Sequence, residues 1–240
     1  MPISNVPDKH FLARSITFAA AMVVVAGPLW ADRADPAPKP RAKPQISEPS
    51  QSQPSAPQST GLDAAVIARK DWQAKPPLFA MKAHKPVAIL VHHTASPANA
   101  TRDIYYKMRS LQTFSQKSAQ LGNGRKRDAW ADVPYHYYVS SDGHIAQGRD
   151  VNFSGDTNTN YDPAGHIQVV LEGNFEKTRP YVEQIEALES LLVSLARKWQ
   201  VPASEIRVHK EVASTLCPGK YLLEIFPSLN ERVDKQLKAQ

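Results

Sequence analysis

The pattern of apolar and polar positions changes at about residue 61, and only the part after it alternates strand-like with helix-like segments. Asp142-Gly143 is a hairpin turn signal within this part. Short runs that are apolar, aromatic or β-branched predict five strands: Val87–His92, Tyr135–Ser141, His144–Gln147, Ile167–Leu171 and Ile206–His209. The continuous Val and Ile run of the first is typical of a strand covered on both faces. The sequence does not reveal the order of these strands in a sheet.

Two segments have the spacing of amphipathic helices. The first runs from Arg102 to about Gln120, where Gly122-Asn123-Gly124 predicts its end. The second begins after Pro180 and stops at Val201-Pro202. Their apolar stripes comprise Ile104, Met108, Leu111 and Phe114 in the first, and Val182, Ile185, Leu188, Leu192, Leu195 and Trp199 in the second. Because strands and helices alternate, residues 61–240 are predicted to form an α/β domain.

The N-terminus has the layout of a secretory signal. Lys9 and Arg14 precede the apolar run Ile16–Ala26, and this run is shorter than the roughly 20 apolar residues of a membrane span. We predict a signal peptide over residues 1–31, cleaved after Ala31, and therefore a secreted or periplasmic protein with no stable membrane span once the signal is removed. An uncleaved anchor remains an alternative.

A second accessory segment follows the signal. Residues 32–60 are dominated by Pro, Ser, Gln, Ala and Lys and contain few aliphatic side chains. Such a segment cannot bury enough apolar surface to offset the entropy lost on ordering. We therefore predict a disordered linker.

The net charge of +6 narrows the choice of partners. A basic exported protein suits polyanions, but the chain has no zinc-finger spacing, no aromatic-rich RNA-binding motif and no long basic helix. We therefore expect anionic cell-envelope polymers as partners and no nucleic acid. Ordinary surface solubility explains the charge equally well.

The single cysteine, Cys217, is the strongest sign of chemistry. A lone thiol makes no internal disulfide, so it is either buried and inert or held by a metal. His209 lies eight residues before it, at the end of a predicted strand, and His92 ends another. Because ligands bind at the carboxyl ends of strands in open α/β sheets, the three side chains could converge on a zinc ion.

Several blocks of the sequence resemble a known family when they are taken together and in order. They are Arg69–Ala74, Val91–Ala95, Trp130–His136, Gly173–Phe175 and His209–Gly219. They resemble the zinc-dependent type-2 N-acetylmuramoyl-L-alanine amidases, which include the peptidoglycan recognition proteins and the phage lysozyme-type amidases. The resemblance covers about residues 66 to 230. It implies an α/β fold with a central mixed β-sheet flanked by helices, and so a type-2 amidase domain over residues 61–240.

The resemblance also implies an activity and a cofactor. His92, His209 and Cys217 would ligate Zn²⁺ and leave a fourth position for water, as in catalytic rather than structural zinc sites. The enzyme would hydrolyse the amide between N-acetylmuramic acid and L-alanine of peptidoglycan or muropeptides, in cell-wall degradation or remodelling. A peptidoglycan-binding module without catalysis is the alternative, although such modules have lost the cysteine ligand. We expect a monomer.

Further site residues follow from the same resemblance. Tyr135 and Thr215 are the expected catalytic residues, with Tyr135 bonding the water or the oxyanion. A Thr hydroxyl is a poor proton donor, so the identity of the general acid stays open. Ring packing for Tyr135 and a local turn bond for Thr215 are alternatives. His93 and Asn174 are the expected substrate contacts, and His93 should face away from His92 because successive strand residues alternate.

Other polar residues receive lesser roles. The alternation that turns His93 away also turns His136 away from Tyr135. Glu172 is expected at the surface or against substrate rather than as a general base, and His166 is expected at the surface or in a loop. The chain departs from the family at Pro134, where Gly is usual, and in an inserted basic loop over Leu121–Asp128. We expect the Arg125-Lys126-Arg127 run of that loop to be solvated.

Overall fold

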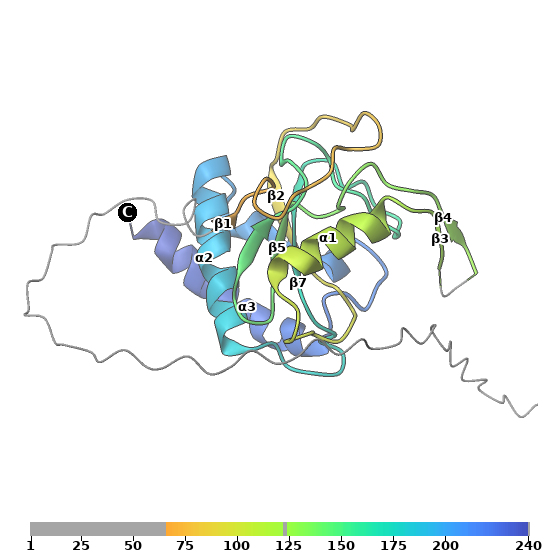
Figure 1. Cartoon of the computed structure of the whole chain (residues 1–240). Helices are drawn as coiled ribbons and strands as arrows, with labels where there is room; N and C mark the ends of the chain where they lie inside the picture. Colours follow the sequence, from red (N-terminus) through yellow and green to blue (C-terminus); the bar gives the residue numbers. More distant parts are fainter. Residues whose placement is uncertain (1–65, 122–123, 240) are drawn as a thin grey trace, which may run out of the picture. The chain divides into compact units, whose positions relative to one another are not determined.

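The computed structural model describes residues 66–121 and 124–239 (Figure 1). All of them belong to one compact unit, Ser55–Gln240. The predicted signal peptide, the predicted linker and the boundary at residue 61 lie outside the described residues. Within the described part, no helix has the length and apolar character needed to cross a membrane.

A six-stranded mixed sheet forms the centre of this unit. Its strands are β1 (Val66–Ile67), β2 (Ala88–His93), β5 (Tyr137–Val139), β6 (Ile145–Gln147), β7 (His166–Leu171) and β8 (Ile206–Val208), in the order β1-β6-β5-β7-β2-β8. Strand β2 lies between β7 and β8 and runs parallel to both, whereas β5 and β6 form the predicted antiparallel hairpin. The five strands predicted from the sequence are all present, with slightly different ends.

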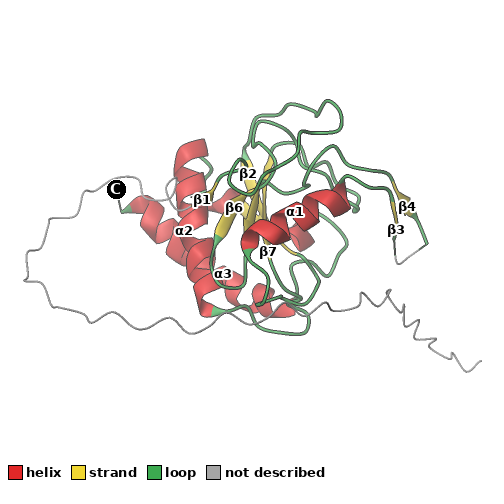
Figure 2. Cartoon of the chain, viewed as in Figure 1, coloured by secondary structure: helices red, strands yellow, loops and turns green. Residues whose placement is uncertain are grey.

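Helices cover both faces of the sheet (Figure 2). Helices α2 (Val182–Trp199) and α3 (Lys220–Lys238) pack on one face through a cluster that includes Val91, Leu188 and Leu229. Helix α1 (Ile104–Ser115) packs on the other face through a smaller cluster that includes Met108. Burial of one such side chain contributes about 1.5–3 kcal/mol. The prediction of a central mixed sheet flanked by helices is confirmed by this architecture.

The sequence prediction was wrong about the region after α1. The helix ends at Ser115 rather than near Gln120, and β3 (Ala119–Gln120) pairs with β4 (Lys126–Arg127) as a small hairpin. Arg127 is not solvated but 5% exposed. Its guanidinium donates to the carbonyls of Phe114, Ser115 and Lys117. Those groups at and beyond the helix end lack helical partners, so the arginine satisfies them and ends the helix.

Helix α3 was not predicted from the sequence. Pro227 lies inside it, and proline in a helical pattern normally indicates a break because it lacks an N–H. The apolar face of the helix, with Leu222, Phe226, Leu229 and Val233 buried against the sheet and α2, stabilises it nevertheless. Tertiary packing therefore overrides the local signal here.

Candidate functional site

Three potential metal ligands meet at the carboxyl ends of β2 and β8. Val91 pairs with Val208 in register, so His92 and His209 follow side by side, with ring centroids 4.5 Å apart. Cys217 joins them from the loop after β8. One ligand atom from each residue lies within 4.8 Å of the other two, and Cys217 Sγ is 3.7 Å from His92 Nδ1. The structure therefore brings together the three residues that the sequence suggested.

The loop that carries Cys217 is fixed by backbone contacts. The His93 N–H donates to Cys217 Sγ at 3.3 Å, and the Cys217 N–H donates to Thr215 Oγ1 at 3.1 Å. Gly219 has a φ of +95°, and a Cβ there would lie 2.4 Å from the Phe175 carbonyl carbon. Only glycine fits such a close approach at positive φ. The Cys-Pro-Gly motif thus places the Cys217 thiol in contact with the end of β2.

Burial keeps the three groups uncharged. It lowers the pKa of His92 well below the usual value, with His209 as the next cause, and lowers that of His209 to about 4. Burial also raises the pKa of the Cys217 thiol to about 12. Neutral imidazoles are ready to ligate a metal, whereas the thiol must lose its proton, which a bound cation favours strongly.

The donor set and its spacing fit zinc. Tetrahedral zinc, with bonds of about 2.3 Å to sulfur and about 2.0–2.1 Å to nitrogen, separates two such ligand atoms by roughly 3.6 Å. The distance from Cys217 Sγ to His92 Nδ1 is 3.7 Å. In addition, His209 Nδ1 is buried and has no hydrogen-bond partner among the described residues. A buried ring nitrogen of this kind needs a partner, and a metal ion supplies one.

Tyr135 lies beside this cluster, just before β5. Its ring is tilted against that of His92, with centroids 5.4 Å apart. Burial raises the pKa of its hydroxyl above the usual value, and the proximity of Cys217 adds to the effect. The phenol therefore stays protonated at neutral pH and can act as a hydrogen-bond donor.

The remaining predicted site residues make local contacts. Thr215 accepts the bond from Cys217 already described, so its hydroxyl shapes the ligand loop. His93 faces away from His92, as alternation predicts, and its Nδ1 accepts the Phe175 N–H at 3.3 Å. Asn174 donates to the Ala95 carbonyl at 3.0 Å. The assignments of Thr215 to catalysis, and of His93 and Asn174 to substrate, stay predictions.

Two further histidines lie away from the cluster. His136 is fully buried, and its ring bonds the Phe153 carbonyl and the Gln168 N–H. His166 is not in a loop but is the first residue of β7, half-buried against Tyr161. Neither belongs to the grouping of possible metal ligands found in the described part of the chain.

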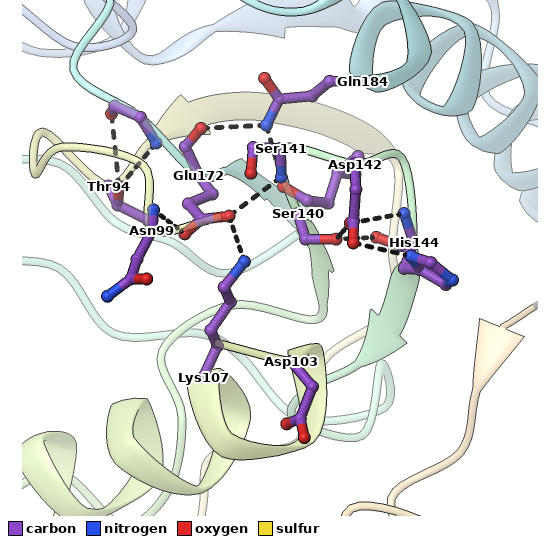
Figure 3. A network of polar contacts seen from close by, with 12 residues as sticks. Thr94, Asn99, Asp103, Lys107, Ser140, Ser141, Asp142, His144, Glu172 and Gln184 are labelled. Atoms are coloured by element: carbon purple, nitrogen blue, oxygen red, sulfur yellow. Dashed lines mark hydrogen bonds and ion pairs between the residues drawn. The ribbon is translucent and has the colours of Figure 1, made fainter. Parts of the chain in front are cut away.

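Glu172 is buried, contrary to the surface or substrate position expected for it. Its carboxylate forms an ion pair of 2.8 Å with Lys107 of α1 and accepts the N–H groups of Asn99 and Ser141, both at 2.9 Å (Figure 3). Glu172 is 4% exposed. It therefore ties α1 and the loop after β2 to the end of β7, close to the candidate ligands.

The sequence reasoning missed the loop between β6 and β7. Thr159 Oγ1 lies 2.7 Å from His209 Nε2, and the Tyr161 ring lies 5.2 Å from the His209 ring. Thr157 and Thr159 also line a polar pocket of about 500 Å³, together with Arg125, Lys126, Arg127, Trp130 and neighbouring residues. This loop has no periodic pattern, so no sequence signal pointed to it.

A family model described as N-acetylmuramoyl-L-alanine amidase matches residues 82–220. Peptidoglycan-recognition protein SD of Drosophila simulans is 25% identical, over 71% of this chain and 90% of that protein. Peptidoglycan recognition protein 1 of Mus musculus is 29% identical, over 68% and 86%. A solved structure of peptidoglycan recognition protein LE in complex with tracheal cytotoxin has a TM-score of 0.58 and 25% identity, covering 69% of this chain and 94% of that one.

Proposed function

Because the chain belongs to the N-acetylmuramoyl-L-alanine amidase family, we propose that it is a zinc-dependent hydrolase of the amide between N-acetylmuramic acid and L-alanine in peptidoglycan. The family and the relatives named above support a function connected with peptidoglycan. The observation that carries the finer proposal is the convergence of His92, His209 and Cys217 beside Tyr135.

In this proposal each residue has a defined task. His92, His209 and the Cys217 thiolate hold the zinc ion. Zinc, when bound, makes a water ligand more acidic and polarises the amide carbonyl. Tyr135 donates a hydrogen bond to the oxygen on which negative charge develops, since its hydroxyl stays protonated. Burial of the two histidines strengthens these electrostatic interactions by lowering the local dielectric constant.

We also propose export to the cell envelope, where peptidoglycan is found. The signal-like pattern of residues 1–31 supports this location. Peptidoglycan or muropeptides would be the partners, and the monomeric state stays a prediction.

The competing function is peptidoglycan binding without catalysis. It is favoured by the relatives, whose names describe recognition rather than hydrolysis. The complete ligand set favours hydrolysis instead, because a module that only binds has no need of two buried histidines beside a half-buried cysteine.

Zinc removal provides the direct test. We expect the zinc-loaded protein to release free stem peptides from peptidoglycan, and the chelated protein to release none until zinc is restored. Mass analysis of the digests would identify the products and the bond cleaved. Activity that survives complete removal of zinc would contradict the metal mechanism, and binding of muropeptides without release of peptide would favour the recognition function.

Substitution of Tyr135 by phenylalanine tests the proposed hydrogen-bond donor. We expect kcat to fall by about 100-fold, as for loss of one donor to a developing oxyanion, while zinc affinity is unchanged. Steady-state hydrolysis of a soluble muropeptide and a zinc titration would measure both. Tyr181→Phe is the matched control, because that ring is 55% exposed at the start of α2 and should leave both quantities unaltered. A kcat within about twofold of wild type for Tyr135→Phe would assign the ring to packing.

A further inference from the structure

We propose that Thr159 is a positioning residue that fixes the ring of His209 for metal binding, an inference that rests on the proposed zinc centre. The two nitrogens of His209 have different surroundings. Nε2 lies 2.7 Å from Thr159 Oγ1, whereas Nδ1 is buried without a hydrogen-bond partner among the described residues. Thr159 thus occupies Nε2, and we assign the metal to Nδ1, which has no protein partner among the described residues.

The Thr159 contact selects the tautomer that a metal needs. A nitrogen that binds a metal uses its lone pair, so the ring proton of neutral His209 must lie on the other nitrogen. With Nδ1 facing the metal, Nε2–H donates to Thr159 Oγ1.

A second threonine fixes the direction of the Thr159 hydroxyl. Thr157 Oγ1 lies 2.7 Å from Thr159 Oγ1, and the Thr159 N–H also donates to Thr157 Oγ1 at 3.0 Å. The Thr159 hydroxyl can therefore donate to Thr157 while it accepts from His209. Because threonine is stiff at χ1, the acceptor that faces Nε2 is held in place.

The loop that bears Thr159 is attached to the sheet beside the metal ligands. The Tyr161 ring packs against His209, and its hydroxyl bonds the side chain of Gln168 at 3.0–3.1 Å. Gln168 is a fully buried residue of β7, the strand that pairs with β2. The loop that carries Thr159 is therefore anchored to the same sheet that carries the metal ligands.

A neutral hydroxyl beside His209 Nε2 differs in its effect from a carboxylate in the same place. Carboxylates that bond the outer nitrogen of a metal-bound histidine raise its basicity. The neutral Thr159 hydroxyl orients the ring without adding negative charge. The zinc ion already carries one thiolate in this proposal, so a neutral partner preserves its ability to polarise a carbonyl.

Zinc affinity measured by competition with a chelator tests the inference without using activity. We expect Thr159→Val, which keeps the shape and removes the hydroxyl, to weaken zinc binding by about 10–100-fold, and Thr159→Ser to restore most of it. With cobalt(II) in place of zinc, the absorption bands of Thr159→Val should change in position or intensity because the ring is less constrained. Thr178→Val is the matched control, since that exposed hydroxyl makes only a 3.4 Å contact with the Asn174 carbonyl.

The possible outcomes separate this inference from the proposed function. Wild-type affinity and spectra in a folded Thr159→Val variant would overturn the role of Thr159 and leave the zinc enzyme intact. A wild-type protein that binds no zinc would overturn both. If Thr159→Val fails to fold, the Thr159→Ala and Thr159→Ser variants can be compared instead. They differ in the same way, because only the serine variant has a hydroxyl.

Discussion

Replacement of Cys217 by alanine should remove zinc from the purified protein and reduce amide hydrolysis to the level of the chelated enzyme. The thiol is one of three candidate ligands and the only cysteine in the chain, so no other thiol can take its place. Loss of a mere outer-sphere partner costs about 10–100-fold in metal affinity, and loss of a direct ligand should cost more. Metal analysis and mass analysis of peptidoglycan digests would measure the two effects.

The matched control for this variant is its neighbour in the same loop. Leu216 is 66% exposed, so Leu216→Ala should retain zinc and activity. Thermal unfolding of both variants in the absence of metal would show whether the loop remains intact. A Cys217→Ala variant that retains full activity would refute the proposed mechanism. If it binds zinc normally but is inactive, the thiol has another role.

Lys107→Met should lower the free energy of unfolding by about 3–5 kcal/mol. Lys107 and Glu172 form an ion pair in which the side chains are 8% and 5% exposed. Removal of one partner leaves the Glu172 carboxylate buried without a counter-charge, and that desolvation cost produces the loss. The hydrogen bonds that the Glu172 carboxylate accepts from the N–H groups of Asn99 and Ser141 offset only part of this desolvation cost. Denaturant unfolding monitored by circular dichroism would provide the measurement.

Lys82→Met is the control for the buried pair. Lys82 also pairs with a carboxylate, Asp162, but both side chains are about two-thirds exposed. Such a surface pair contributes about 0–1 kcal/mol, so this variant should unfold almost as wild type does. Equal, small losses for the two lysine variants would show that the Glu172 network does not stabilise the fold.

Much of the fold follows from local patterns in the sequence. The Val and Ile run before His92 and the helix predicted after Pro180 lie where periodicity places them. Leu188, Leu192 and Leu195 of the predicted apolar stripe are buried, whereas Val182 is 70% exposed. Helix α3 and the hairpin after α1 were missed. In both cases contacts made by the folded chain outweigh a local sequence signal. For α3 these contacts are the packed apolar face around Pro227, and for the hairpin they are the hydrogen bonds of Arg127 to the end of α1.

The same division applies to the candidate site. His92, His209 and Cys217 could be named from the sequence because two histidines end strands and the family motifs order them with the cysteine. Glu172 and Thr159 could not be placed. Whether Glu172 is buried depends on Lys107, 65 residues away, and Thr159 meets His209 across 50 residues of chain.

By itself, the sequence determined five of the strands and two of the helices, the residue types able to bind a metal and the two strands at whose ends the histidines lie. The tertiary structure alone decided the strand order, the meeting of three ligand atoms within 4.8 Å and the contact between Thr159 and Nε2 of His209. The physical reason is the range of the interactions. Periodicity reports which face of a segment is buried, whereas burial of charge and direction of hydrogen bonds depend on groups that only the folded chain brings together.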